Sequence, residues 1–423
     1  MSGSAPIENL LYHLAISTYA KAVDIAAYKN PKARFLAKGQ REVWEKLEAI
    51  GANDRVVWFH AASLGEFEQA RPLIERLRLS NPEFKVLLTF FSPSGYEIRK
   101  NYSEADWVCY LPFDTPQNAR RFVKTAHPEF AIFIKYEIWR NYLLELRDAD
   151  IPAYLVSAAF RPGQAFFRPY GVKYREWLRL FSAIYVQDEN SRLLLDSIGI
   201  TGSVVAGDTR FDRVTDIMKQ RKDLPEIQKF INPLRQNGKI VMVVGSSWQP
   251  DEEVYIPWLS RHSEVAAIIA PHEFDSERLR KLLDRFDGEA VLHSELLRNP
   301  DAGEGKHILI IDCFGLLSSI YRFADLAYVG GGFGVGIHNI NEAAVYGIPV
   351  GFGPNYHRFI EAEELIAHEG AFSISGKEDF DTKASALLEA APREKMGRNA
   401  GEYIHSKLGA SDAIARALFP KHS

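Results

Sequence analysis

The stretch "VVWFHAASLGEFEQARPLIERL", residues 56–77, changes its hydrophobic period at a turn of small residues. Residues 56–59 are β-branched or aromatic, which is typical of a buried parallel strand. The segment therefore predicts a strand, a tight turn and a helix, which is the repeating unit of open α/β sheets. The helical part is marked by apolar residues at helical spacing, namely Phe67, Ala70, Leu73, Ile74 and Leu77.

Glu66 lies in this turn, directly after Gly65 and three residues after Ser63. Ligands of open α/β sheets bind outside the carboxyl ends of the strands, so a carboxylate here is expected to face a cleft. A glutamate in the first turn of a helix also interacts favourably with the helix dipole, and position alone leaves this structural role open. Other parts of the sequence are needed to distinguish a ligand-facing role of Glu66 from this structural role.

The strand and helix pattern repeats along the chain in two series, one ending near residue 207 and the other beginning near residue 239. Strands that alternate with helices predict parallel sheets, and the number of strands is too large for one sheet. We therefore predict an α/β protein with two Rossmann-like domains. The predicted strands are "VVWF", "VLLTFF", "VCYLPF", "FAIFI", "AYLVSAAF", "AIYVQ" and "VVAG", then "KIVMVVGSS", "VAAIIAP", "AVLHS", "HILIID", "LAYVGGG" and "IPVGFG".

The domain boundaries follow from composition. A charged segment with two prolines and no strand signal separates the two series and is expected to be a linker. The last helical segment has no strand partner and is expected to cross back and brace the first domain. The predicted regions are 1–45, an amphipathic and basic segment; 46–207, the first Rossmann-like domain; 208–238, the linker; 239–391, the second Rossmann-like domain; and 392–423, the bracing helix.

Composition restricts the function further. The 423 residues are 46% hydrophobic and 25% charged, as in ordinary soluble globular chains. A net charge of -4 argues against a nucleic-acid partner, which would require a strongly basic face. Cys109 and Cys313 form neither a disulfide framework nor a CxxC metal motif, and a reducing cytoplasm is the expected compartment. The aspartates are scattered rather than paired as a DxD site would be, so no metal is expected.

Residues 7–28 form an apolar stripe on a predicted helix, with Leu11, Leu14 and Ile25 among its members. Charged residues interrupt the segment, so it is predicted to be amphipathic rather than membrane-spanning. A basic run beside such a helix suits anionic headgroups or a phosphorylated lipid. The alternative is a helix packed on its own domain beside a solvated basic face. The basic residues are Lys29, Lys32, Arg34, Lys38 and Arg41.

A glycine-rich loop follows a strand in "LAYVGGGFGVGIHNINEAAVYGIPVGFG", residues 326–353. Its glycines permit close approach of the backbone to a ligand, and a helix beginning near His338 or Asn339 is expected to hold a phosphate on its free amides. The loop lies late in its domain and lacks the dinucleotide fingerprint, which disfavours a nicotinamide enzyme. A nucleotide-sugar transferase keeps its donor site at this position, although a tight packing loop is the structural alternative.

Five ordered motifs are similar to those of the 3-deoxy-D-manno-octulosonic acid (Kdo) transferases, and they extend from the N-terminal helix to about residue 370. They are "HAASLGEFEQARPLI", "IKYEIWRNYL", "GDTRFDRV", "IIAPHEFDSER" and "YVGGGFGVGIHNINEA". The resemblance implies a GT-B glycosyltransferase with two facing Rossmann-like domains, parallel sheets and an interdomain cleft. It further implies inverting transfer of Kdo from CMP-Kdo to a lipid A precursor in lipopolysaccharide biosynthesis. The expected location is peripheral, on the anionic cytoplasmic face of the inner membrane, with no cofactor and no metal.

The resemblance also assigns roles to single residues. Glu66 matches the catalytic base, while Glu137 and Arg210 match positions that stabilise the transition state. Arg210 replaces the family's usual lysine, and "GIHNINEA" replaces a stretch usually closer to GGHNPLEP, which puts the detailed loop shape in doubt. The positions that match contacts to CMP are Pro271, His272, Gly315, Leu316, Leu317, Asn339, Ile340, Asn341 and Glu342.

Two other functions stay open at this point. A sugar-nucleotide 2-epimerase of the same architecture would use two cleft carboxylates on one soluble substrate. A non-catalytic lipid- or nucleotide-binding scaffold would bind without releasing CMP.

Overall fold

The computed structural model describes residues 5–419, with side chains from Tyr12 onward. The chain forms two compact units. The first unit contains the residues up to Arg213 together with those from Gly409 onward, and the second unit is Val214–Leu408.

The first unit is built on a seven-stranded sheet whose paired strands are all parallel. The strand order is β3-β2-β1-β4-β5-β6-β7, so β1 lies between β2 and β4. The strands are β1 (Arg55–Ala61), β2 (Phe84–Phe90), β3 (Trp107–Tyr110), β4 (Phe130–Ile134), β5 (Ala153–Ala158), β6 (Ala183–Val186) and β7 (Val204–Val205).

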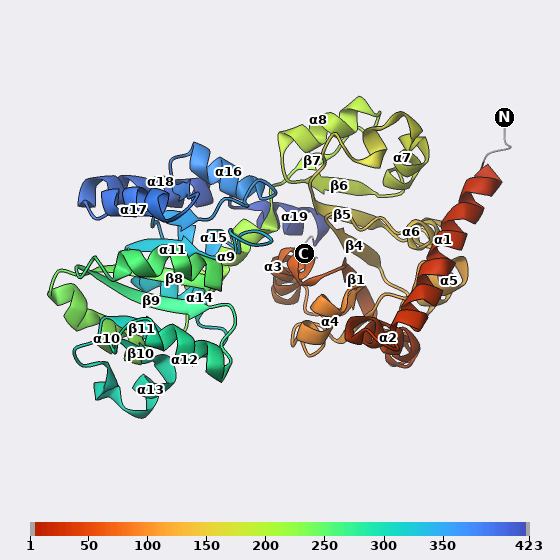
Figure 1. Ribbon diagram of the computed structural model, residues 1–423. Helices are drawn as coiled ribbons and strands as arrows, with labels where there is room; N and C mark the ends of the chain where they lie inside the picture. Colours follow the sequence, from red (N-terminus) through yellow and green to blue (C-terminus); the bar gives the residue numbers. More distant parts are fainter. Residues whose placement is uncertain (1–4, 420–423) are drawn as a thin grey trace. The chain divides into compact units, whose positions relative to one another are not determined.

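Helices cover both faces of this sheet (Figure 1). Successive side chains of a strand point to opposite faces, and β1 accordingly contributes Trp58 to one buried core and Phe59 to the other. The first-unit helices are α1 (Ala5–Ala26), α2 (Pro31–Glu48), α3 (Leu64–Ser80), α4 (Pro93–Arg99), α5 (Pro116–Ala126), α6 (Arg140–Asp148), α7 (Val172–Leu178), α8 (Glu189–Ser197) and α19 (Ala410–Leu418), while α9 (Thr209–Lys219) contains the division between the units.

The second unit repeats this plan with a second seven-stranded parallel sheet, of order β10-β11-β9-β8-β12-β13-β14. Its strands are β8 (Ile240–Ser247), β9 (Val265–Pro271), β10 (Ala290–Leu292), β11 (Ile308–Ile310), β12 (Leu326–Val329), β13 (Val350–Phe352) and β14 (Ala371–Ser373). Its helices are α10 (Pro225–Gln236), α11 (Gln249–Leu259), α12 (Ser276–Asp284), α13 (His293–Arg298), α14 (Leu317–Ile320), α15 (Asn341–Ala344), α16 (Ile360–Ala367), α17 (Lys377–Ala386) and α18 (Ala390–Ser406).

The α/β fold with two parallel sheets is therefore confirmed, and the predicted runs correspond to β1–β13. The two units divide inside the segment 208–238 in which the boundary was expected. Residues 208–238 are largely helical, because they contain α9 and α10, and the units divide after Arg213. Residues 392–423 do not form one helix: most of α18 lies in this region and belongs to the second unit, whereas α19 belongs to the first. Asp212 fixes the start of α19, since its carboxylate accepts hydrogen bonds from the backbone N–H groups of Gly409 (2.7 Å) and Ser411 (2.6 Å).

The N-terminal helix α1 lies along the first unit (Figure 1). Its packed side is defined by Tyr12, which hydrogen-bonds Asp114, and by Val23, which is buried in a core. The predicted apolar stripe faces the other way, because Leu14 is 60% exposed and Ile25 is 72% exposed. The side chain of Leu11 lies outside the described residues. Along the described chain, every helix is too short or too polar to cross a membrane.

Candidate functional site

The strand order of the first unit reverses at β1. The chain passes from β1 to β2 on one side, and β4 is inserted on the other side of β1. Segments that leave β1 and β4 therefore diverge at the carboxyl ends of these strands, which is where open α/β sheets bind ligands. Glu66 follows β1 and Glu137 follows β4, so sheet topology brings both predicted carboxylates to the same edge.

Glu66 lies in the first turn of α3 and is half-buried. The sequence Ser63-Leu64-Gly65-Glu66 has the spacing of a capping box, in which the serine and glutamate side chains would bond backbone N–H groups. The structure forms no side-chain cap here. The Ser63 hydroxyl donates instead to Oε2 of Glu66. The Glu66 carboxylate therefore does not cap the helix. The structural role that remains for it is a favourable interaction with the helix dipole.

Glu137 is held by ring nitrogens from two elements. Trp139 Nε1 donates to Oε2 of Glu137 at 2.8 Å, and His60 Nε2 lies 3.3 Å from the same oxygen. His60 is the penultimate residue of β1 and is fully buried, whereas the Glu137 side chain is 14% exposed. The backbone before it is sharply turned, with Lys135 at φ +65°. The ends of β1 and β4 are thus joined by side chains at the predicted site.

Arg210 folds its guanidinium onto a buried carboxylate. Its Nε and Nη2 lie 2.8 and 2.7 Å from Oδ2 of Asp208, and Gln69 donates to Oδ1 at 3.0 Å. Burial alone would raise the pKa of Asp208, but the charge and hydrogen bonds of Arg210 outweigh it and lower the pKa. Burial raises the pKa of Tyr136, and the positive charge of Arg210 opposes this shift. Arg210 therefore lies near the loop that carries Glu137.

The second unit has its own reversal of strand order between β8 and β12. The glycine loop starts there, since Gly330 N donates to Gly245 O at 2.9 Å. A Cβ on Gly330 would lie 2.5 Å from Ser246 O, and Gly331 adopts a φ of +93°. These glycines are required for packing of the loop against the sheet. A tight packing loop therefore explains part of the glycine-rich motif without a ligand. Gly334, in contrast, is exposed.

Asp251 anchors the start of this loop. Its buried carboxylate accepts hydrogen bonds from Trp248 N (2.8 Å), Gly331 N (3.0 Å) and the Tyr328 hydroxyl (2.9 Å). Burial raises the pKa of Asp251, and these three donors oppose the shift. The sequence analysis did not identify Asp251, because an aspartate in the first turn of a helix is an ordinary feature.

Three rings stack beside the loop. His272 stacks with both Trp248 and His338, with centroids 4.3 and 4.7 Å away and interplanar angles of 24° and 30°. Trp248 Nε1 also donates to His338 Nε2 at 3.3 Å. Pro271, which precedes His272, is the buried last residue of β9. The predicted Pro271–His272 pair therefore lies next to the glycine loop, at the edge of the sheet where a nucleotide would bind.

The remaining predicted contacts lie at two short helices. Gly315 has a φ of +78°, Leu316 is buried and Leu317 starts α14. A hydrogen bond from the Tyr346 hydroxyl to Ser318 O (2.9 Å) connects α14 with the segment that follows α15.

The expected helix start near His338 or Asn339 was wrong. The helix α15 begins at Asn341 and has only four residues, so few peptide dipoles are aligned to hold a phosphate. Ile340, which precedes it, is buried rather than directed at a ligand. Asn339 bridges the helix start instead, since its Oδ1 accepts from Asn341 N (3.2 Å) and its Nδ2 donates to Glu342 Oε1 (3.0 Å). The Oδ1 atom of buried Asn341 makes no hydrogen bond to any described residue, which leaves unused acceptor capacity at this position.

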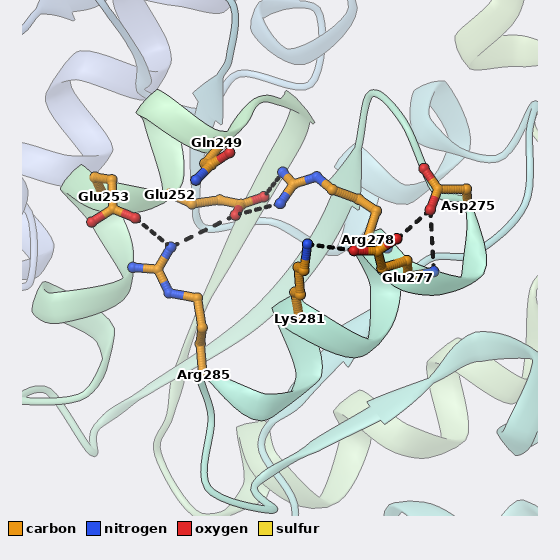
Figure 2. Close-up of a pocket in the computed structure, with 8 residues that line it drawn as sticks. All are labelled: Gln249, Glu252, Glu253, Asp275, Glu277, Arg278, Lys281 and Arg285. Atoms are coloured by element: carbon orange, nitrogen blue, oxygen red, sulfur yellow. Dashed lines mark hydrogen bonds and ion pairs between the residues drawn. The ribbon is translucent and has the colours of Figure 1, made fainter.

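A separate cavity of about 590 Å³ lies between α11 and α12 (Figure 2). Its cations are satisfied by neighbouring carboxylates. Arg285 is 2.8 Å from Glu253, Lys281 is 2.6 Å from Glu277, and Arg278 pairs with buried Glu252. The cavity is therefore an ion-pair network that joins two helices. Within the described residues, His, Cys, Asp and Glu side chains form no group of three or more that could hold a metal ion.

Two parallel α/β units, each with a reversal of strand order in its sheet, define the GT-B class of fold. A solved structure of UDP-GlcNAc 2-epimerase from Neisseria meningitidis, bound to UDP-GlcNAc, has this fold with a TM-score of 0.56. The match covers 84% of this chain and 99% of that chain at 16% sequence identity, and it shows the fold alone.

The sequence relationship is more specific. The sequence model of the 3-deoxy-D-manno-octulosonic-acid transferase (kdotransferase) family matches residues 33–213. The 3-deoxy-D-manno-octulosonic acid transferase of Rickettsia felis is 28% identical over 355 residues, covering 81% of this chain and 73% of that protein. The transferase of the same name from Aquifex aeolicus is 26% identical over 349 residues, covering 82% and 90%. The chain is thus similar to the Kdo transferase family over residues 33–213, and to these two transferases over about four fifths of its length.

Proposed function

We propose that the chain is an inverting glycosyltransferase that moves Kdo from CMP-Kdo to a lipid A precursor. The observation that carries the proposal is the placement of the family motifs. Each motif lies at or after the carboxyl end of a strand, which is the ligand-binding edge of this fold, and three of them follow β1, β4 and β12 at the reversals of strand order.

In the proposed reaction, Glu66 is the base. A sugar hydroxyl is a poor nucleophile, so a carboxylate that accepts its proton speeds attack on the anomeric carbon. The hydroxyl oxygen bonds to that carbon, the bond from the carbon to the phosphate oxygen of CMP breaks, and CMP leaves with the bonding electrons. Direct displacement inverts the anomeric centre. The half-buried position of Glu66, outside any helix cap, supports this role.

In the proposed reaction, Glu137 and Arg210 stabilise the charges that develop in the transition state. Positive charge develops at the anomeric carbon in glycosyl transfer, and an ionised Glu137 would stabilise it. Negative charge develops on the departing phosphate, and the guanidinium of Arg210 would stabilise it. Proton acceptance and these two charges supply the chemistry, so the proposed mechanism uses no metal and no cofactor.

The nucleotide is assigned to the second unit. The unused acceptor of Asn341 and the Glu342 carboxylate suit the hydroxyl and amino groups of a cytidine nucleotide. The exposed residue Gly334 leaves loop backbone open to a phosphate. Pro271, His272 and the segment 315–317 complete the proposed contacts.

The lipid acceptor requires a membrane surface. The exposed stripe of α1 and the basic residues that follow it support peripheral association with the anionic cytoplasmic face of the inner membrane. Arg34 and Lys38 are exposed, although Arg34 also donates to Ala27 O at 3.2 Å and Lys38 lies 3.5 Å from Glu42.

Release of CMP distinguishes the transferase from its alternatives. Incubation with CMP-Kdo should release CMP quickly only when a lipid A precursor is present. A sugar-nucleotide epimerase would act on its nucleotide sugar without any lipid. A binding scaffold would bind the nucleotide and release no CMP with any acceptor, which would contradict the proposal.

A further inference from the structure

A line of side-chain contacts runs from the core of the first unit to Glu137. Trp58 Nε1 donates to the Thr89 hydroxyl at 2.8 Å, and Thr89 Oγ1 lies 2.9 Å from His60 Nδ1. His60 Nε2 lies 3.3 Å from Oε2 of Glu137, and Trp139 Nε1 donates to that same oxygen at 2.8 Å. These residues come from β1, β2 and the loop after β4, so the line crosses three neighbouring strands.

The donors in this line can be assigned in one consistent direction. The Thr89 oxygen already accepts the N–H of Trp58, which leaves its own proton for another acceptor. Nδ1 of His60, at 2.9 Å, is closer than the alternative acceptor, the carbonyl of Phe59 at 3.3 Å. A neutral imidazole that accepts at Nδ1 carries its proton on Nε2, and this proton points to Glu137.

The opposite tautomer leaves a conflict. If His60 carried its proton on Nδ1, the lone pair of Nε2 would face the carboxylate of Glu137 at 3.3 Å. Trp139 Nε1 also donates to His60 Nε2 at 3.0 Å, so its single N–H would be shared between the ring nitrogen and the carboxylate. The lone pair of Nε2 facing the carboxylate oxygen is unfavourable, which favours the tautomer that Thr89 selects.

The inner part of the line is shielded from solvent. Trp58, His60 and Thr89 are fully buried, and the Trp139 ring is fixed against Phe91 with a centroid distance of 4.7 Å. Both donors converge on Oε2 of Glu137, and Oε1 makes no hydrogen bond to a described residue. The carboxylate is held by one oxygen, and its other oxygen is left for a substrate.

We propose that His60 is a positioning residue for the transfer reaction: Thr89 sets its tautomer, and His60 together with Trp139 holds the Glu137 carboxylate in a fixed orientation. This inference rests on the proposed function of Glu137. It adds three residues, His60, Thr89 and Trp139, that act through the carboxylate rather than on the substrate.

The tautomer is tested first on the unmodified chain, without any turnover. Nitrogen NMR of protein with isotope-labelled histidine distinguishes a protonated Nε2 from a protonated Nδ1, and the His60 signals are assigned by their loss in His60→Gln. The proposal expects the proton of neutral His60 on Nε2. A proton on Nδ1 of the neutral ring would overturn the proposal, whatever the activity of the chain.

Kinetics then test the consequence with a matched pair at Thr89, two contacts away from Glu137. Thr89→Val keeps the shape and removes the hydroxyl, whereas Thr89→Ser keeps the hydroxyl. A hydrogen bond to a charged group is strong, so Thr89→Val should lower kcat by about tenfold or more with KM for CMP-Kdo unchanged. Thr89→Ser should restore kcat. Equal kcat for both variants and the parent would overturn the positioning role.

If Thr89→Val fails to fold, variants of Trp139 and His60 test the positioning role instead. Trp139→Phe keeps the ring that packs on Phe91 and removes the donor, so it should lower kcat by a similar factor. His60→Gln retains an amide donor toward Glu137 and should keep more activity than His60→Leu. If His60 were itself the base, His60→Gln and His60→Leu would be equally inactive, which contradicts the proposal. An unmodified chain that releases no CMP would refute the proposed function instead, and the tautomer result would still stand on its own.

Discussion

At the residue scale, the two predicted carboxylates of the first unit have different surroundings. Glu66 has one hydroxyl partner in a half-buried turn. Glu137 has two ring-nitrogen partners and a side chain that is 14% exposed. A group that accepts a proton needs access to its substrate, whereas a group that stays charged needs fixed donors. The surroundings therefore suit Glu66 as the base and Glu137 as the fixed charge.

The role of Glu66 leads to the first prediction. Glu66→Gln keeps the size of the side chain and removes proton acceptance, so kcat should fall by at least about a hundredfold. CMP binding should be unchanged, because the nucleotide is assigned to the second unit. Steady-state kinetics and calorimetry of the same preparation measure both. Turnover close to that of the parent would exclude Glu66 as the base.

The second prediction concerns the nucleotide. If the Glu342 carboxylate accepts hydrogen bonds from CMP, Glu342→Ala should weaken CMP binding by about tenfold. Glu342→Gln retains an acceptor for Asn339 Nδ2 and should give an intermediate affinity. Circular dichroism checks that both variants are folded. Unchanged CMP affinity in the alanine variant, measured by calorimetry, would return this segment to a packing role.

Sequence patterns predicted the two carboxylates, Glu66 and Glu137, but not the side chains that contact them. Glu66 and Glu137 each follow a strand-like run, and strand ends are visible in hydrophobic periodicity. The contact of His60 with Glu137 depends on the pairing of β1 with β4, which strand patterns do not specify. Both His60 and Trp139 lie inside the motifs that resemble the Kdo transferases, so their position was the available signal.

At the scale of elements, α1 presents its predicted apolar stripe to solvent rather than to its own unit. Leu14 and Ile25 are exposed, and Tyr12 and Val23 face the packed side. An exposed stripe beside basic residues is the pattern of a helix that lies on a membrane surface. The third prediction tests whether this helix and the basic residues beside it contact a membrane.

Four basic residues near α1 are expected to bind anionic lipid, each contributing about 1 kcal/mol, weakened by salt. Changing all four to Gln should lower association with anionic vesicles at low salt. Transfer to acceptor embedded in vesicles should fall as well, whereas transfer to acceptor dispersed in detergent should be spared. Cosedimentation and product formation measure these effects. The four residues are Lys29, Lys32, Arg34 and Lys38, all exposed.

The matched control removes the same charge elsewhere. Four exposed lysines of the second unit, changed to Gln together, should leave vesicle association at the level of the parent. Equal vesicle binding by the parent and the α1 variant at low salt would show that the basic run is only a solvated surface. The control lysines are Lys219, Lys229, Lys377 and Lys395.

The last helix gives the fourth prediction. Asp212 is 6% exposed and accepts the N–H groups at the start of α19. Asp212→Ala leaves these donors without their acceptor and should lower the free energy of unfolding by about 1–2 kcal/mol. Thermal unfolding of the variant and the parent tests this value. An unchanged unfolding temperature would mean that α19 is held by its apolar contacts alone, through residues such as Ile414 and Leu418.

At the scale of the whole molecule, the two parallel sheets were predictable because each buried strand is a short apolar run between turn signals. The strand β14, Ala371–Ser373, was missed because its sequence carries no distinct strand pattern. Composition placed the division of the units in the segment 208–238 but did not reveal the helices in that segment. A charged helix such as α9 looks like a linker in sequence, and the return of α19 depends on the contacts of Asp212.

The most direct test of the account is the chemical structure of the product. The unmodified chain should be incubated with CMP-Kdo and a lipid A precursor, and the recovered lipid analysed by mass spectrometry and NMR. The account predicts a lipid that has gained Kdo through an anomeric centre inverted relative to CMP-Kdo, in an amount that falls by at least about a hundredfold with Glu66→Gln. A lipid without added Kdo, a product of retained anomeric configuration, or equal product from both chains would contradict it.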